Sequence, residues 1–196
     1  MRVLILANND GGIWSFRREL VEKLAKDNEV YFCVPNGEFV QRIKALGATF
    51  IDNLLLDRHG TNPIKELKLI SFYKKVLREI RPDIVFTYTI KCNAYGGMAC
   101  ASLGVPYVAN VTGLGTAIEN GGLMQKIGLT LYKMGLRKAQ KVFFQNTENR
   151  DFMVALFYHA FFCKKQKRPE KQSLFVNPLK LMTMDPTSTL SWLLLL

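Results

Sequence analysis

Three glycine-containing segments each follow a short aliphatic run and carry groups suited to holding a phosphate or a sugar. The segments are 8–12 (Asn-Asn-Asp-Gly-Gly), 87–97 (Thr-Tyr-Thr-Ile-Lys-Cys-Asn-Ala-Tyr-Gly-Gly) and 111–116 (Val-Thr-Gly-Leu-Gly-Thr). Glycine lets a backbone approach a ligand closely, and amides, hydroxyls and one lysine supply hydrogen-bond donors. The chemistry that these residues predict is recognition of a phosphate or a sugar.

The first segment contributes Asn9, Asp10, Gly11 and Gly12 ahead of a helix expected from about residue 14. Paired glycines permit positive φ and close approach of the backbone, and we expect the helix N-terminus to offer free N–H groups and a partial positive charge to a phosphate or a sugar hydroxyl. The spacing matches neither the dinucleotide fingerprint nor the P-loop. A tight strand-to-helix turn explains the same residues equally well.

In the second segment, Lys91 predicts a point charge for an anionic group, and Asn93 is a candidate cap of the following helix. Gly96 and Gly97 fall within that helix, where each costs about 1 kcal/mol relative to alanine. Something must therefore approach them closely. Packing of the helix on the sheet is the simpler explanation, and contact with a ligand is the alternative.

The third segment interleaves hydroxyls with glycines through Thr112, Gly113, Gly115 and Thr116. Such a loop can present amides and hydroxyls to a phosphate or sugar without a charged side chain, and a plain turn is the alternative. Asp10 or Glu119 could orient an acceptor hydroxyl, but the sequence supplies no partner for either. We therefore assign substrate-binding residues and no catalytic residue.

Short aliphatic runs alternate with helical patterns along the chain, which predicts an α/β fold: a Rossmann-like parallel sheet with helices on both faces. In such a sheet the ligand crevice lies beyond the carboxyl ends of the strands, where the strand order reverses, so the three segments should gather there. The predicted strands are 3–7, 30–34, 49–51, 84–88, 107–110 and 142–145, and the predicted helices are 14–26, 38–46, 63–81, 93–103 and 122–139.

The chain has 196 residues and a net charge of +11, which favours anionic partners. No nucleic-acid recognition motif accompanies this charge, so we expect no nucleic-acid partner. Four cysteines without a C-x-x-C pair and two histidines give no metal-ligand spacing, so no metal site is expected. No apolar run is long enough to cross a bilayer, and we expect a cytoplasmic protein with reduced thiols.

The helix expected at 122–139 and the residue pair that follows carry five cations and no acid: Lys126, Lys133, Arg137, Lys138 and Lys141. A basic amphipathic helix of this kind can rest on an anionic membrane surface. The alternative is a solvated face above an ordinary core stripe. Peripheral attachment to the inner face of the cell membrane is thus an expectation of the sequence.

Composition changes after about residue 155, because all 14 glycines lie between Gly11 and Gly135. We expect a Rossmann-like domain at 1–155 and an irregular, poorly ordered tail at 156–196, with one helix continuing from Glu148 through Phe162. No second α/β domain is expected within the chain.

Six blocks of residues, taken in order, resemble the amino-terminal half of bacterial family 4 glycosyltransferases. They are Val3–Gly12 with Phe16-Arg17, Val34–Phe39, Arg58–Pro63, Tyr88–Gly97, Asn110–Thr116 and Phe143–Asn146. The resemblance is greatest to enzymes that extend a sugar on undecaprenyl diphosphate for capsule, O-antigen or N-glycan precursors. It covers roughly residues 1–155.

The resemblance implies half of a GT-B fold, in which the amino-terminal domain receives the acceptor and the carboxyl-terminal domain binds the nucleotide sugar. It implies transfer of a hexosyl or N-acetylhexosaminyl unit, with retained configuration and without metal or other cofactor, from a nucleotide diphosphate sugar to a lipid-linked glycan acceptor. We expect a truncated product that depends on a separate donor-binding domain. A non-catalytic acceptor-holding or membrane-docking module is the alternative.

Overall fold

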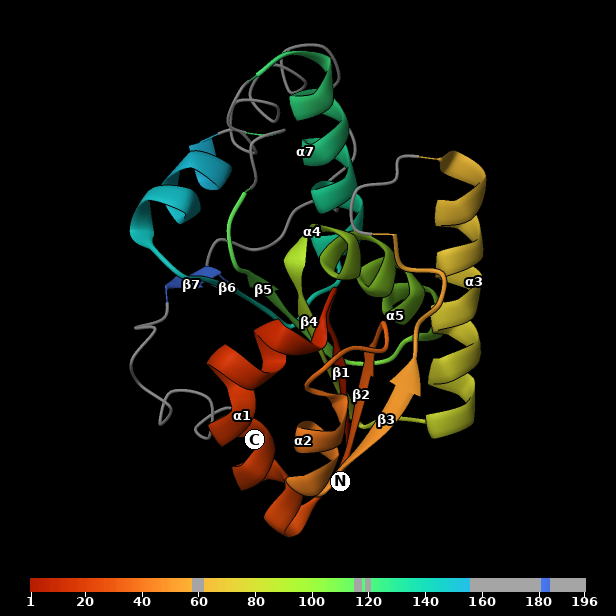
Figure 1. The fold of residues 1–196 in the computed structure, drawn as a ribbon. Coiled ribbons are helices and arrows are strands. Elements are labelled where there is room, and N and C mark those ends of the chain that lie inside the picture. The colour runs from red at the N-terminus through yellow and green to blue at the C-terminus, as the bar shows by residue number, and fades with distance from the viewer. Residues whose placement is uncertain (58–61, 115–117, 119–120, 156–180, 184–196) are drawn as a thin grey trace.

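The computed structural model describes residues 1–57, 62–114, 118, 121–155 and 181–183. Within them, seven parallel strands form one sheet in the order β3-β2-β1-β4-β5-β6-β7 (Figure 1). The strands are β1 (Arg2–Leu6), β2 (Glu29–Val34), β3 (Ala48–Asp52), β4 (Ile84–Tyr88), β5 (Tyr107–Val111), β6 (Lys141–Phe144) and β7 (Leu181–Thr183). The six predicted strands are confirmed, each to within one residue at either end.

Helices cover both faces of this sheet, as predicted. On one face lie α1 (Asp10–Asp27) and α2 (Val40–Ala45), and on the other lie α3 (Pro63–Ile80), α5 (Gly97–Leu103) and α7 (Gly122–Leu136). Strand β1 serves both cores, because Val3 and Ile5 pack with α1 while Leu4 and Leu6 pack with α3 and α5. The alternation follows from the period of two in a strand.

The strand order reverses between β1 and β4, so β2 lies on one side of β1 and β4 on the other. Leu6 at the end of β1 pairs with Cys33 of β2 and with Thr87 of β4. The segments that follow β1, β4 and β5 therefore leave the sheet at one common edge, where ligands of open α/β sheets bind.

Helix α1 begins at Asp10, four residues earlier than predicted. Asn9 is its N-cap, with extended backbone, and the side-chain oxygen of Asn9 accepts a hydrogen bond from the Gly12 amide at 2.6 Å. Gly11 and Gly12 thus lie in the first helical turn, and neither has positive φ. The prediction of a glycine loop at this position is wrong.

The segment between β4 and α5 is helical throughout, whereas the sequence predicted a helix only from residue 93. It runs through α4 (Thr89–Lys91) and the π-helical turn η1 (Cys92–Gly96). Helix α3 matches its prediction, because Asn62 caps it through the amides of Ile64 and Lys65 and Pro63 occupies its first turn.

Strand β7 was not predicted, because no regular hydrophobic pattern follows residue 155. Its three residues extend the sheet beyond β6, with Leu181 opposite Val142. Of the helix expected at 148–162, residues 147–155 are described and helical. The rest of the expected tail, 156–180 and 184–196, lies outside the described residues. Among described residues, no helix is both long and apolar enough to cross a membrane.

Candidate functional site

The structure brings three of the predicted segments to one edge of the sheet. Asn9 follows β1, Lys91 follows β4 and Thr112 follows β5, and these three strands are neighbours. Asp10, Gly11, Gly12, Asn93 and Gly113 belong to the same segments. Gly115, Thr116 and Glu119 lie outside the described residues, so the third segment is described only as far as residue 114.

Asp10 is buried and binds backbone within the protein. Its carboxylate accepts hydrogen bonds from the Phe39 amide at 2.6 Å and from the Gly11 amide at 2.9 Å. A Cβ at Gly37 would overlap this carboxylate, so only glycine fits there. Asp10 therefore fastens the segment between β2 and α2 to the start of α1.

The first turn of α1 also has fewer free donors than the sequence predicted. The Gly12 amide is bonded to the Asn9 side chain, and the Gly11 amide to Asp10. The expectation that this helix N-terminus offers these N–H groups to an anion is corrected, because the chain's own side chains already accept from both. A ligand anion would have to displace a capping oxygen.

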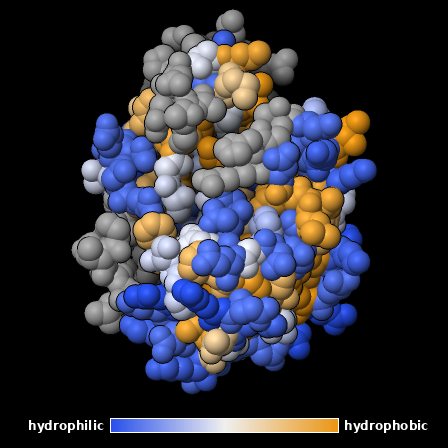
Figure 2. All heavy atoms as spheres, in the orientation of Figure 1, coloured by the Kyte–Doolittle hydropathy of each residue, from blue (hydrophilic) through white to orange (hydrophobic). Residues whose placement is uncertain are grey.

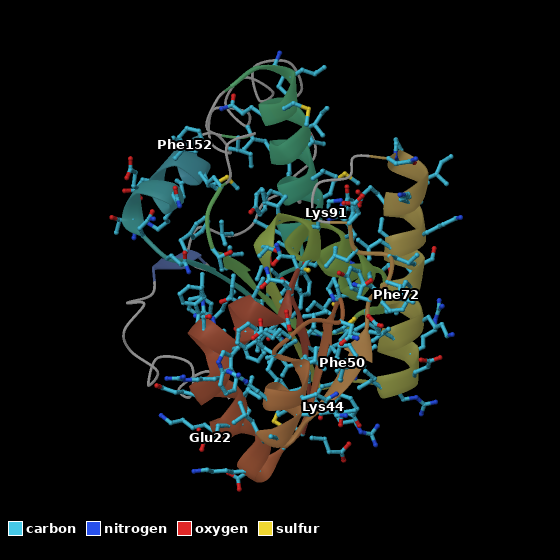
Figure 3. The ribbon with its side chains drawn as sticks, in the orientation of Figure 1. Glu22, Lys44, Phe50, Phe72, Lys91 and Phe152 are labelled. Carbon is cyan, nitrogen blue, oxygen red and sulfur yellow. The ribbon has the colours of Figure 1, made fainter. Side chains whose placement is uncertain are left out.

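Lys91 has an internal partner as well. Its ammonium group lies 2.6 Å from the Glu66 carboxylate on α3 and donates to the Asp57 carbonyl oxygen at 2.6 Å. Lys91 is labelled in Figure 3. The two side chains of the ion pair are only 17% and 12% exposed. The Glu66 carboxylate also affects Tyr95. Burial is the larger cause and the Glu66 charge the smaller cause that raise the pKa of Tyr95 to about 12. Lys91 thus joins α4 to the first turn of α3.

Asn93 lies inside η1 and is completely buried, so it does not cap a helix as the sequence suggested. Its side-chain oxygen accepts from the Thr87 hydroxyl at 2.7 Å, and its amide group donates to the Asn110 carbonyl oxygen at 2.8 Å. Asn110 in turn donates to the Thr87 carbonyl oxygen at 3.3 Å. Asn93 therefore joins the ends of β4 and β5 at the edge of the sheet where the three predicted segments meet.

The two glycines of the second segment are explained by packing. A Cβ at Gly96 would lie 2.7 Å from a methyl carbon of Leu6 on β1, and a Cβ at Gly97 would overlap the Gly135 carbonyl of α7. That carbonyl accepts a hydrogen bond from the buried Tyr107 hydroxyl at 2.6 Å. Gly96 confirms helix-to-sheet packing, whereas Gly97 permits contact between two helices.

The third segment begins with Thr112, half-buried, and Gly113, whose φ of 142° favours glycine. The Gly113 carbonyl oxygen accepts a hydrogen bond from the buried Tyr132 hydroxyl at 3.4 Å. Among the described residues, no atom lies within 4 Å of where a Gly113 Cβ would be. The described part of the protein therefore leaves the side-chain position of Gly113 uncovered at the carboxyl edge of the sheet.

Two further residues at this edge were not among the predicted site residues. Thr89 follows β4 with φ of 70°, which is rare for a β-branched residue and marks strain of the kind found at functional sites. Arg17 of α1 places its guanidinium 5.1 Å from the centre of the Tyr88 ring. Burial raises the pKa of Tyr88 to about 12, and Arg17 opposes this shift.

A sequence signal for Arg17 existed. It lies four residues after Ile13 and three before Leu20, both buried, which places it on the inward face of α1. A cation on that face is directed toward the end of β4. Thr89 carried no comparable signal, because its backbone conformation depends on the turn from β4 into α4.

The fold and the site edge define a Rossmann-like domain of the GT-B type. Residues 2–146 match the sequence model of the family described as glycosyl transferase 4-like, and the chain belongs to this glycosyltransferase family. It is similar to the N,N'-diacetylbacillosaminyl-diphospho-undecaprenol alpha-1,3-N-acetylgalactosaminyltransferase of Campylobacter jejuni, with 30% identity over 159 residues. The match covers 78% of this chain and 42% of the relative.

Solved structures show the same fold at low identity. HepE of Anabaena in complex with UDP-glucose matches 94% of this chain and 43% of its own length, with a TM-score of 0.63 and 12% identity. The UDP-GlcNAc 2-epimerase of Methanocaldococcus jannaschii matches 93% and 45%, with a TM-score of 0.61 and 12% identity. The chain thus spans less than half the length of each of these relatives.

Proposed function

We propose that this chain supplies the acceptor side of a glycosyltransferase. The enzyme transfers a hexosyl or N-acetylhexosaminyl unit from a nucleotide diphosphate sugar to an undecaprenyl-diphosphate-linked glycan, in capsule, O-antigen or N-glycan precursor synthesis. The observation that carries this proposal is the 30% identity to a transferase acting on such a lipid-linked sugar. The convergence of three polar segments on one sheet edge supports it.

The chemistry requires that the leaving diphosphate be neutralised while its bond to the sugar breaks. Cations and backbone donors can provide this without a metal, and we propose a reaction that needs neither metal nor cofactor and retains the anomeric configuration. Arg17 is suited to the diphosphate of the lipid-linked acceptor at the switch point, because its guanidinium presents a fork of donors. The nucleotide sugar is then a co-substrate bound mainly by a donor-binding domain.

We propose that the residues predicted to bind substrate still line the acceptor site, but that several of them act by holding the backbone in place. Asn9, Asp10, Gly11 and Gly12 shape the floor, with Asp10 holding it through Phe39. Lys91 and Asn93 act on the acceptor through the segments they fix rather than by direct contact. Thr112 and Gly113 form the opposite wall, and Gly115 and Thr116, which lie outside the described residues, remain proposed substrate-binding residues from the sequence alone. We place the reaction at the cytoplasmic face of the membrane, where the lipid-linked acceptor is held.

A second candidate function is an acceptor-holding or membrane-docking module without turnover of its own. Helix α7 favours it, because Leu123, Met124 and Ile127 are exposed beside the cation Lys126. Such a face suits an anionic membrane surface. The two candidates differ in whether a donor-binding half completes the cleft.

Calorimetric titration tests the acceptor-side proposal. The chain should bind a short-chain polyprenyl-diphosphate-linked sugar more tightly than UDP-GlcNAc or UDP-GalNAc, and Arg17→Ala should weaken acceptor binding by about tenfold, as expected for one lost charge-assisted contact. Lys23→Ala, on the exposed side of the same helix, is the matched control. Preference for the nucleotide sugar would contradict the acceptor role, and sugar transfer by the chain alone would contradict its need for a donor-binding half.

A further inference from the structure

A shallow groove of about 510 Å³ runs along the outer face of α3. Its apolar lining comes from Leu55, Ile64, Leu67 and Phe72, and its polar lining from Lys68, Ser71 and Lys75. The core-facing side of α3 is a different one, formed by Leu69, Tyr73, Val76 and Leu77, all buried. The helix therefore has two apolar faces, of which only one is covered by the rest of the described protein.

The uncovered face exposes large apolar side chains to an unusual degree. Ile64 is 66% exposed, Leu67 65% and Leu55, which lines the groove from the segment after β3, 40%. Figure 2 shows hydrophobic residues grouped on the side of the molecule where Figure 1 places α3. Single exposed apolar residues are ordinary, but a contiguous apolar surface with a polar border marks an interaction site.

The charges around this face are positive. Lys65, Lys68 and Lys75 are exposed on the same helix. Of its acids, Glu66 is 12% exposed and turned onto Lys91, while Glu79 pairs with Lys75 at 3.8 Å. Among the residues that the structure describes, no carboxylate lines the groove. Its occupant should therefore combine an apolar body with negative charge.

The position of α3 at the carboxyl edge of the sheet indicates which kind of occupant fits the groove. α3 follows β3 and α7 follows β5, so both helices begin at the carboxyl edge of the sheet, where the candidate site lies (Figure 1). The first turns of α7 expose Leu123, Met124 and Ile127 beside Lys126. The first turns of α3 and α7 thus both expose apolar and basic residues at the carboxyl edge of the sheet. A flat anionic surface could contact both.

We propose that the outer face of α3, formed by Ile64, Leu67, Lys68 and Lys75 together with the neighbouring Leu55, docks on an anionic lipid bilayer. The apolar side chains enter the boundary between headgroups and acyl chains, and the lysines contact lipid phosphates. The inference rests on the proposed function, in which the acceptor is held in the membrane. It deepens that function by naming the surface that turns the crevice toward the lipid.

Vesicle sedimentation of the full chain tests this surface. Wild-type protein should bind vesicles of phosphatidylcholine mixed with phosphatidylglycerol, and bind pure phosphatidylcholine vesicles weakly. The double variant Ile64→Ser/Leu67→Ser should lower the partition coefficient by about tenfold or more, because two apolar side chains no longer leave water. Lys68→Glu/Lys75→Glu should lower it by a similar factor and remove most of its salt dependence.

Matched controls lie on the opposite face of the sheet. Phe16→Ser removes an aromatic side chain that is 73% exposed on α1, and Lys23→Glu/Lys26→Glu reverses two exposed charges on the same helix. Neither control should change vesicle binding by more than about twofold. Circular dichroism confirms that each variant is folded, which is expected because the replaced side chains are exposed.

The outcomes separate this inference from the proposed function. Unchanged vesicle binding by both α3 variants overturns the inference, and the acceptor titration with Arg17→Ala still decides the proposed function. Sedimentation velocity without lipid provides a second decision: a dimer of the wild type that Ile64→Ser/Leu67→Ser dissociates would assign this face to a second copy of the chain and overturn lipid docking.

Discussion

Lys91 and Glu66 form an ion pair with 2.6 Å between the ammonium nitrogen and a carboxylate oxygen, and this pair joins α4 to the first turn of α3. The residues are 25 positions apart in the sequence. The pair lies at the edge where β4 ends, so the cation that the sequence offered to a ligand neutralises a carboxylate of the protein instead. Lys91 therefore supports the candidate site through an ion pair inside the protein.

Lys91→Met should lower the free energy of unfolding by about 2–3 kcal/mol, because Glu66 would remain largely buried without its partner. Urea denaturation measures the change. The double variant Lys91→Met/Glu66→Leu should recover part of the loss, since it removes both charges. A loss below about 0.5 kcal/mol in the single variant would show that the pair behaves as an exposed one.

Asp10→Ala should destabilise the protein by about 2 kcal/mol, because two backbone amides lose a charged acceptor. Hydrogen exchange should show the Phe39 amide losing its protection. Asp27→Ala, at the exposed end of the same helix, is the control and should leave both quantities nearly unchanged. Retained protection at Phe39 would mean that the segment after β2 does not depend on Asp10.

Gly97→Ala should destabilise by about 3 kcal/mol, since the new methyl group would overlap the Gly135 carbonyl and force α5 and α7 apart. Gly11→Ala is a suitable comparison, because its nearest neighbour would be 3.6 Å away and its φ is negative. It should be neutral or slightly stabilising, as alanine favours a helix. Thermal and urea unfolding measure the stabilities of the two variants. Nearly equal stabilities would contradict the prediction that only Gly97 is held against another backbone.

Alkaline pH should destabilise the protein through its buried thiols. Burial raises the pKa of Cys92 from 9.0 to about 11, with the Tyr73 hydrogen bond opposing the shift. The unfolded thiol loses its proton near pH 9 while the folded one keeps it, so the stability contribution present below pH 9 is lost as pH rises toward 11. The expected slope is about 1.4 kcal/mol per pH unit for this thiol.

Urea unfolding at a series of pH values between 8 and 10.5 measures that slope, and Cys92→Ala should make it shallower by this amount. The remaining cysteines and the tyrosines are common to both proteins and cancel in the comparison. Identical slopes would mean that Cys92 ionises equally in the folded and unfolded states.

The sequence predicted the sheet well because its strands are short aliphatic runs buried on both faces. The start of α1 escaped prediction, since Asn-Asp-Gly-Gly is typical of a loop and only the Asn9 side chain, bonded to Gly12, makes it a helix start. The partners of Lys91 and Asn93 come from α3, β4 and β5. Such pairings depend on tertiary structure and leave no local pattern.

The close crossing of η1 and α7 at Gly97 and Gly135 leaves no side-chain layer between the two backbones. Side chains that interdigitate can slip past each other, but two touching backbones cannot rotate without losing contact. The angle between α7 and the segment that holds Asn93, which is bonded to Asn110 at the end of β5, is therefore fixed. Any contact that orients α7 therefore also orients the ends of β4 and β5, where the candidate site lies.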